Sequence, residues 1–190
     1  MADAVLTKSL HHILEETFLG LDQGINPTAA LYTATVENTL TVTGASTLSG
    51  AVTLKQPVVS AAATLTAAQS GSFCLWNAAV GFTYTLPAAA AGLVFEFFVT
   101  VTNTSVTHKL SCAAGDFFLG SVVGIDTDTS NAVAAYTADG TTHDHINGNG
   151  TTTGGLLGTY YRVVAADAVV WMVSGTVLGS GIVATPFATS

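Results

Sequence analysis

The chain has 190 residues, of which 49% are hydrophobic and only 8% are charged, against about 25% charged residues in a typical soluble domain. Twelve acidic and four basic residues give a net charge of −8, and the scattered cations form no phosphate-binding patch, which excludes nucleic acid and anionic membranes as expected partners. So few charged side chains cannot cover a monomer with polar surface, so we expect an obligate oligomer.

The N-terminal residues MADAVLTKSLHHILEETF lack the continuous apolar stretch of a signal peptide. No run of about 18 apolar residues is long enough to span a bilayer. The two cysteines, Cys74 and Cys112, stand alone in apolar or small-residue stretches without a CxxC pair. We therefore expect a chain made in the cytoplasm, with buried free thiols in place of a disulfide.

Residues 1–35 are expected to form an N-terminal arm with one amphipathic helix, from Asp3 to about Leu19. Apolar residues recur there at helical spacing, and Gly20 supplies a stop. The stripe consists of Leu6, Leu10, Ile13, Leu14 and Phe18. A single short helix cannot bury such a stripe alone, so it must dock on its own domain, on copies of itself, or on another protein.

Residues 36–57 contain a six-residue repeat, TVTGASTLSGAVTL at 41–54. Thr alternates with an aliphatic residue and each unit breaks at Gly-Ala, which is typical of very short strands joined by tight bends. Such units gain a core only when copies wind around each other, which predicts an intertwined trimeric β neck. Its inward layers at the trimer interface would be Val42, Leu48 and Leu54. The alternative is a β-hairpin whose bends resemble a repeat by chance.

Residues 58–190 predict an all-β domain, because β-branched and aromatic runs alternate with Gly, Asn, Asp or Pro. About six to eight strands with frequent turns favour a β-sandwich or a jelly-roll-like barrel. Alternating residues predict which side chains form the core, and the segment between Pro87 and Gly92 is expected to be a loop or one helical turn. Trp76 and Trp171 are expected to be core or interface anchors. The predicted core side chains from the alternation are Phe82, Tyr84, Leu86, Phe95, Phe97 and Val99.

The repeat LTVTGASTLSGAVTL, running into TLTAAQSGSFCLWNAAVGFTYTLPAAAAGLVFEFFVTVTNTSVTHKLSCAAGDFFLGSV, resembles the trimeric structural proteins of tailed bacteriophages. It is most similar to capsid decoration (cement) proteins and head fibres, with tail-fibre modules as the near relative. The similarity covers roughly residues 39–125 and consists of a repeat followed by a TLP…G…F.F body. It implies a homotrimer that is assembled in the bacterial cytoplasm and carried on the virion surface.

Two histidines are candidates for a metal-binding site. In THDHING, His143 and His145 would share one face of an extended segment, with Asp144 on the other. Three copies near a trimer axis could ligate a metal through imidazole nitrogens. The polar, glycine-rich NGNGTTTGG that follows favours a solvated loop, so no metal is expected.

The remaining candidates for chemistry are weaker. DTDTSN at 126–131 alternates oxygen ligands like a calcium loop, but it lacks the glycine at the sixth position and the distant bidentate Glu, which favours an Asx-rich turn. Glu96 lies between two phenylalanines in FEFF, with no second carboxylate nearby in sequence. A triad is also conceivable but unspecific in a serine-rich chain; its members would be His108, Asp116 and Ser111 or Ser121.

These observations predict a structural protein without catalytic residues, cofactor or metal. The leading hypothesis is a trimeric decoration protein whose helical stripe binds the phage major capsid protein, so that the protein lies on the capsid surface and stabilises the shell. The alternative is a tail-fibre or receptor-binding module that recognises a host surface ligand. A fibre shaft needs many repeats, and a neck of two hexads favours decoration. A third hypothesis is an enzyme such as a depolymerase.

Overall fold

The computed structural model of the protein describes residues 58–128 and 132–190. The predicted helical stripe and the predicted neck lie outside these residues, so both stay predictions. They comprise Leu6, Leu10, Ile13, Leu14 and Phe18 in the helix, and Val42, Leu48 and Leu54 in the neck.

The described residues form an all-β domain, which confirms the all-β part of the predicted fold class. Its strands are β1 (Val58–Val59), β2 (Ala63–Thr64), β3 (Ser72–Trp76), β4 (Thr83–Thr85), β5 (Val94–Val99), β6 (His108–Ser111), β7 (Phe117–Asp126), β8 (Val133–Asp139), β9 (His145–Gly148), β10 (Tyr160–Ala165), β11 (Val170–Gly179) and β12 (Phe187–Ala188). The helical part of the described chain is one 3-10 turn, η1 (Ala67–Gln69).

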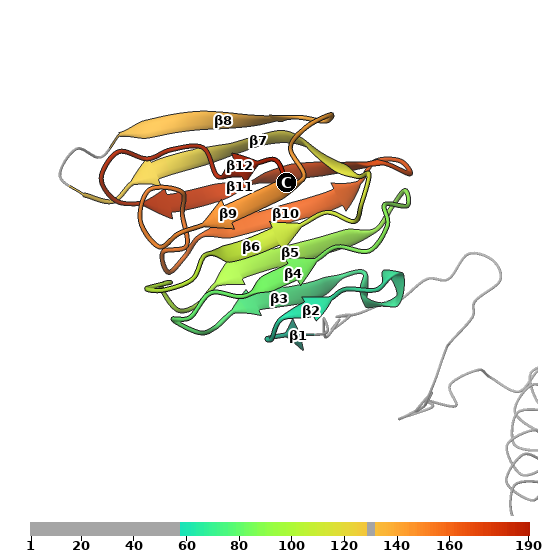
Figure 1. Ribbon diagram of the computed structural model, residues 1–190, viewed down its shortest axis with the longest axis horizontal. Coiled ribbons are helices and arrows are strands. Elements are labelled where there is room, and N and C mark those ends of the chain that lie inside the picture. Colours follow the sequence, from blue (N-terminus) through green and yellow to red (C-terminus); the bar gives the residue numbers. More distant parts are fainter. Residues whose placement is uncertain (1–57, 129–131) are drawn as a thin grey trace, which may run out of the picture. The chain divides into compact units, whose positions relative to one another are not determined.

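The strands form two sheets that lie face to face (Figure 1). The seven-stranded sheet has the order β1-β3-β5-β10-β11-β7-β8, and the five-stranded sheet has the order β12-β9-β6-β4-β2. Several neighbours are parallel, namely β1 with β3, β3 with β5, β2 with β4, β4 with β6, and β7 with β11. These mixed sheets differ from a jelly roll, in which neighbouring strands are antiparallel.

Four of the five parallel pairs arise because the first six strands alternate between the two sheets. The chain passes from β1 in one sheet to β2 in the other, and then back to β3 beside β1. Parallel neighbours need a crossover connection, and here the crossover is a strand of the opposite sheet. Runs that read as one unit in the sequence, such as HKLSCAAGDFFLGSVVG, therefore divide into two strands in different sheets, here β6 and β7. This is why the structure has more strands than the sequence predicts.

The core between the sheets is aromatic, as the alternation predicts. Trp76 from the seven-stranded sheet contacts Tyr84 from the five-stranded sheet, with ring centroids 5.5 Å apart, and Tyr84 contacts Phe97 at 5.6 Å. The Tyr84 hydroxyl donates to the carbonyl of Leu75 or Val59, both at 2.9 Å. The other predicted members are buried or packed against the core, including Phe82, Leu86, Phe95, Val99 and Trp171. Contacts across both sheets hold the sandwich together.

Two smaller predictions for this domain are confirmed. Cys74 and Cys112 are buried free thiols, and burial raises the pKa of Cys74 to about 12. A thiol with such a pKa is almost entirely protonated at neutral pH, so it is a poor nucleophile. Residues 87–92 form a loop between β4 and β5 without a helical turn, and Gly92, with φ of 92°, lies just before β5.

Candidate interaction surface

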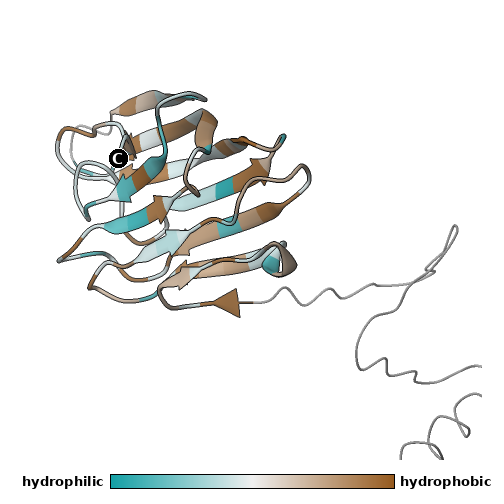
Figure 2. Ribbon diagram, turned by 45° about the vertical axis from the view of Figure 1, so that its right-hand side comes forward, coloured by the Kyte–Doolittle hydropathy of each residue, from teal (hydrophilic) through white to brown (hydrophobic). Residues whose placement is uncertain are grey.

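The seven-stranded sheet has a second apolar face, turned away from the core. Buried and less buried residues alternate along its strands, and the register places the outward side chains of neighbouring strands side by side. We call this surface the outer apolar face. Its large apolar and aromatic members include Val58, Phe73, Leu75, Val94, Phe98, Leu119, Val123, Ile125, Tyr160, Val164 and Met172. In Figure 2 the hydrophobic colour extends along most strands and the hydrophilic colour is confined to short stretches.

One aliphatic row crosses the outer apolar face. It runs from Val94 on β5 through Val164 on β10 and Met172 on β11 to Leu119 on β7. Met172 is 43% exposed and Leu119 is 39% exposed. Large apolar side chains are therefore in contact with solvent in the middle of the sheet, where an isolated soluble domain usually places polar ones.

A neighbouring group on the same face is aromatic. The rings of Phe98 on β5 and Tyr160 on β10 are 4.8 Å apart, and Phe73 on β3 lies 6.1 Å from Phe98. Aromatic rings at these separations attract each other beyond the area they bury. The group forms a rigid surface across three strands, which suits a binding surface because little side-chain entropy is left to lose.

Glu96 and Arg162 lie together near the middle of the outer apolar face. They are paired residues on β5 and β10, and the Arg162 Nε atom is 3.5 Å from Glu96 Oε1. The flanking Phe95 and Phe97 point the opposite way, into the core, so Glu96 is not enclosed between phenylalanines as FEFF suggests. The pKa of Tyr160 is raised mainly by burial, and further by the charge of Glu96 and a hydrogen bond with Glu96. The charge of Arg162 lowers this pKa by a smaller amount.

The outer face of the five-stranded sheet is polar. Thr85 on β4 pairs with Ser111 on β6, which pairs with His145 on β9, and the next row contains Lys109 and Asn147. The inward residues of the same strands are mostly apolar or aromatic, including Tyr84, Leu110 and Ile146, and His108 also points inward. This sheet follows the pattern of a sheet with one face on the core and one face in water.

The exposed large hydrophobic residues confirm this difference between the sheets. Among the described residues, those that lie in strands are all in the seven-stranded sheet: Val58, Leu119, Val123, Val133 and Met172. Scattered exposed apolar residues are normal, whereas large apolar patches mark interaction sites. Here the aliphatic row and the aromatic group lie on the two sides of a polar row, which consists of Glu96, Arg162, Ser174 and Ser121.

No prediction from the sequence included this surface, although the sequence carries a signal for it. The strands VFEFFV (Val94–Val99) and FFLGSVVGID (Phe117–Asp126) contain large apolar residues at both alternating sets of positions. The strands TYT (Thr83–Thr85) and HKLS (His108–Ser111) alternate more strictly. Near-continuous apolar strands are typical of sheets that are buried on both faces, and among the described residues only one face of the seven-stranded sheet is covered.

A second group of exposed apolar residues lies at the end of the sandwich opposite to the start of β1. Three loops there are tied together: the Asn103 N–H donates to the Gly155 carbonyl at 2.9 Å, and the Gly81 N–H donates to the Ser105 carbonyl at 2.9 Å. They expose Val80, Val101, Val106 and Leu157. We call this group the loop tip.

Val106 in the loop tip has a strained backbone, with φ of 57°, a conformation that is rare for a β-branched residue. It is held by buried Asn103, whose side-chain amide donates to the Val106 carbonyl at 2.6 Å and to the Gly148 carbonyl at 2.9 Å. Strained residues on an exposed surface are candidates for function.

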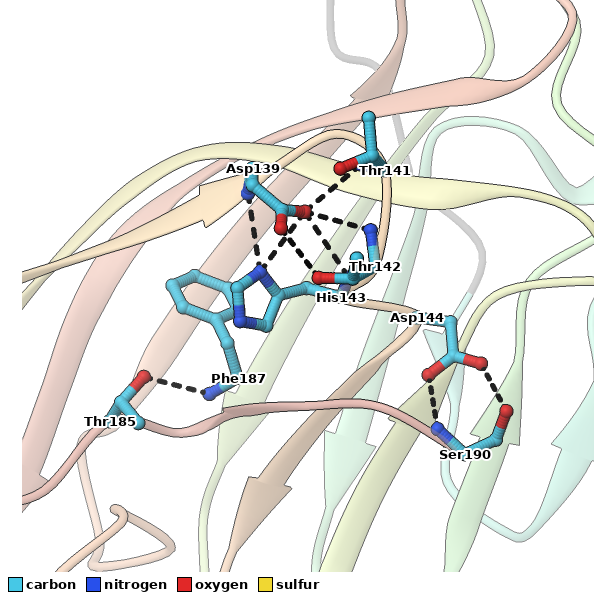
Figure 3. A network of polar contacts seen from close by, with 8 residues as sticks. All are labelled: Asp139, Thr141, Thr142, His143, Asp144, Thr185, Phe187 and Ser190. Atoms are coloured by element: carbon cyan, nitrogen blue, oxygen red, sulfur yellow. Dashed lines mark hydrogen bonds and ion pairs between the residues drawn. The ribbon is translucent and has the colours of Figure 1, made fainter.

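His143 lies in the turn between β8 and β9, beside Asp139 (Figure 3). The Asp139 carboxylate accepts the backbone N–H groups of Thr141 and Thr142, both at 2.9 Å, and also the Thr142 hydroxyl. These hydrogen bonds lower the pKa of Asp139, and the bond from the Thr142 hydroxyl has the largest effect. The His143 ring stacks near Phe187, with centroids 5.8 Å apart. His143 is thus part of an ordered turn.

His145 begins strand β9, so the segment is not the solvated loop that the glycine-rich context predicts. Its Nδ1 atom is 2.7 Å from Asp144 Oδ1, so Asp144 and His145 interact instead of pointing to opposite sides. Asp144 also accepts the Ser190 hydroxyl at 2.6 Å and the Ser190 N–H at 2.9 Å (Figure 3). Burial raises the pKa of Asp144, but these hydrogen bonds outweigh burial and lower it.

The other predicted chemical groups are separated in the fold. His108 points into the core, where neither ring nitrogen has a hydrogen-bond partner. Ser111 is on the outer face of the five-stranded sheet, and Ser121 is on that of the seven-stranded sheet. The Asp116 carboxylate accepts the Ala89 N–H at 2.8 Å. The conceivable triad is therefore not assembled within the chain.

The DTDTSN segment behaves as the predicted Asx-rich turn in its described part. Asp126 Oδ1 accepts the Asp128 N–H at 3.0 Å, and Asp128 Oδ2 accepts the Gly181 N–H at 3.0 Å. Both residues line a pocket of about 360 Å³ with Ile182 and Val183. Across residues 58–128 and 132–190, no three His, Cys, Asp or Glu side chains are placed to hold a metal ion together.

In comparisons with known proteins, no family model, no curated protein and no solved structure matches the chain. Within the described residues there is no helix of the length and apolar character needed to cross a membrane.

Proposed function

We propose that this protein is a structural virion component, a homotrimeric capsid decoration (cement) protein that binds the outer capsid surface and stabilises the shell. The observation that supports it most directly is the outer apolar face, with Met172 and Val123 more than two-fifths exposed in the single chain. A domain with such a face is suited to assembly. The capsid location is supported by the resemblance of residues 39–125 to phage decoration proteins.

In this proposal the two parts of the chain have different roles. The predicted stripe with Leu10 and Leu14 binds the major capsid protein, and the β domain projects from the shell. Three arms on one trimer bind together, so avidity strengthens each weak contact. Shell stability increases because the protein binds only the assembled shell.

The proposal is tested by adding purified protein to phage shells that lack it. Deletion of residues 1–30 should abolish co-sedimentation with the shells and leave the β domain folded, because the aromatic core lies after residue 57. Fluorescence of the buried Trp76 and Trp171 reports folding. Glu16→Ala, on the polar side of the predicted helix, is the control that should still bind. Undiminished binding of the truncated protein would place the attachment surface elsewhere.

A tail-fibre or receptor-binding module is the second candidate, and the loop tip favours it. Its loops expose Val80, Val106 and Leu157 at the end opposite to the start of β1, where a projecting domain would meet a host ligand. An electron-microscopy map of virions with this chain located on the head or on the tail distinguishes the two functions directly.

A further inference from the structure

The outer apolar face needs a partner that covers it. Several of its strands carry large apolar side chains on both sides. On β5, Phe97 points inward and Phe98 points outward, and on β11, Trp171 points inward and Met172 points outward. Burial of apolar area supplies about 25 cal/mol per Å², so a face of this size is left in water at a considerable cost in free energy. The opposite sheet already has a polar outer face suited to solvent.

We propose that the partner is the same face of the other copies of this chain, so that the seven-stranded sheets line the axis of the homotrimer and the five-stranded sheets face solvent. This inference rests on the proposed homotrimer and names the surface that forms it. The charges on the face also permit copies to meet. The chain carries −8, yet on the outward positions of strands β3, β5, β10, β11 and β7 the charged residues are Glu96 and Arg162, which neutralise each other. Asp139 also points outward, but it lies on the edge strand β8 beside Leu119. Copies can therefore meet at the centre of the face without like-charge repulsion.

The position of the Glu96–Arg162 pair also favours contact between copies. Strand β10 is the fourth of the seven strands, so Arg162 lies at the centre of the face. Its side chain is 48% exposed and contacts Glu96 through Nε, which leaves other N–H donors of the guanidinium for a second carboxylate. Around a three-fold axis, Arg162 of one copy can bind Glu96 of the next, and the alternating charges fix the register of the copies.

The face is also large enough for association. Its five longest strands, β5, β10, β11, β7 and β8, have six to ten residues and are roughly 20–33 Å long, whereas β3 has five residues and β1 has two. With strands about 4.8 Å apart, the face covers several hundred Å², which is of the order of the roughly 800 Å² per partner of a stable protein interface. The Phe98–Tyr160 pair near its centre supplies the rigid aromatic contacts that dominate binding at such interfaces.

The test is thiol labelling of the full chain at two matched positions. Met172→Cys places a thiol on the outer apolar face, and Thr85→Cys places one on the polar face of the other sheet. The native Cys74 and Cys112 are buried and give little background. In the trimer, the Met172→Cys thiol should react at least about 30-fold more slowly than the Thr85→Cys thiol, as expected when a central contact is desolvated. Dilution into monomers should make the two rates similar.

Association is measured in parallel by light scattering. Met172→Asp should raise the concentration at which the trimer dissociates by about 30-fold or more, whereas Thr85→Asp should leave it unchanged. Reversal of one charge in Glu96→Arg or Arg162→Glu should also weaken the trimer, and the two changes together should restore it.

The outcomes separate this inference from the proposed function. A trimer in which Met172→Cys labels as fast as Thr85→Cys overturns the inference and leaves the homotrimer in place. A face that is unprotected in free protein but protected on phage shells also overturns it, because the capsid protein is then the partner. A protected trimer that does not bind shells supports the inference and contradicts the decoration function.

Discussion

At the residue scale, the most unusual side chain in the core is His108. It is 2% exposed on the inner face of β6, with the Trp76 ring centroid 5.4 Å away and Phe82 at 5.8 Å, and neither of its nitrogens has a partner in hydrogen-bond geometry. Burial lowers the pKa of His108. The backbone of Val101, which lies near the ring but outside good hydrogen-bond geometry, opposes this effect more weakly. The folded protein therefore holds this ring neutral, because a buried charge without a partner is strongly unfavourable.

The first prediction concerns acid stability. Below the ordinary histidine pKa of 6.5, the unfolded chain binds a proton at His108 that the folded chain does not. The free energy of unfolding must then fall as the pH falls through this value, by at most about 1.4 kcal/mol per pH unit for one proton. Denaturant titrations at pH 7.5 and pH 5 measure it in the parent and in His108→Phe.

The difference between the two proteins isolates His108 from the other titrating groups. We expect the variant to lose less stability on acidification than the parent. Equal losses in both proteins would mean that the His108 ring protonates freely in the folded state. His145→Phe is a control, because His145 lies on the outer face with an aspartate beside it.

At the element scale, the sequence predicts the strands well and their pairing poorly. Alternation identifies Tyr84, Phe95 and Phe97 as core residues because each fills the space between two sheets. The parallel pairing of β3 with β5 depends on which strand crosses to the opposite sheet, and local periodicity carries no information on that choice. Turn residues mark where a strand ends but not which sheet the next strand joins.

The same reasoning explains which parts of the candidate surface could be predicted. Composition predicts that apolar surface is covered by other chains, which stays a prediction, and the apolar residues on both sides of VFEFFV could have identified one apolar outward strand. The contact of Glu96 with Arg162 joins strands that are far apart in the sequence. Only the fold brings these two residues together at the centre of the face, away from Asp139 on the edge strand β8.

The second prediction concerns Gly175 in β11. A Cβ atom at this position would clash with the Tyr160 carbonyl and lie 3.0 Å from the Tyr161 Cα atom on the neighbouring strand β10. Gly175→Ala should therefore force the two central strands apart and lower the free energy of unfolding by about 1–3 kcal/mol. Ser174→Ala, at the adjacent outward position, should change it by less than about 0.5 kcal/mol. Thermal unfolding of both variants measures the difference, and a Gly175→Ala variant as stable as the parent would contradict the close pairing.

At the scale of the whole molecule, the two proposed trimer contacts act on different parts of the chain. The predicted neck would join three copies through Val42, Leu48 and Leu54, and the outer apolar face joins them through the sheet around Met172. The β1 strand, with which the seven-stranded sheet begins, directly follows the repeat segment 36–57. A neck that brings three copies together raises the local concentration of the sheet faces, so each contact strengthens the other.

The last prediction tests this arrangement with Leu48→Asp. Light scattering of the parent should give a mass of three times 19.2 kDa, and three carboxylates in one apolar layer should cost several kcal/mol per trimer through desolvation and repulsion. If the sheet faces also hold the trimer, Leu48→Asp alone raises the dissociation concentration, and adding Met172→Asp gives a folded monomer. Thr41→Asp, at a position predicted to face water, is the matched control. A Leu48→Asp protein that assembles as tightly as the parent would show that Leu48 does not point inward. A Leu48→Asp protein that is fully monomeric with an intact Met172 would assign the association to the neck alone.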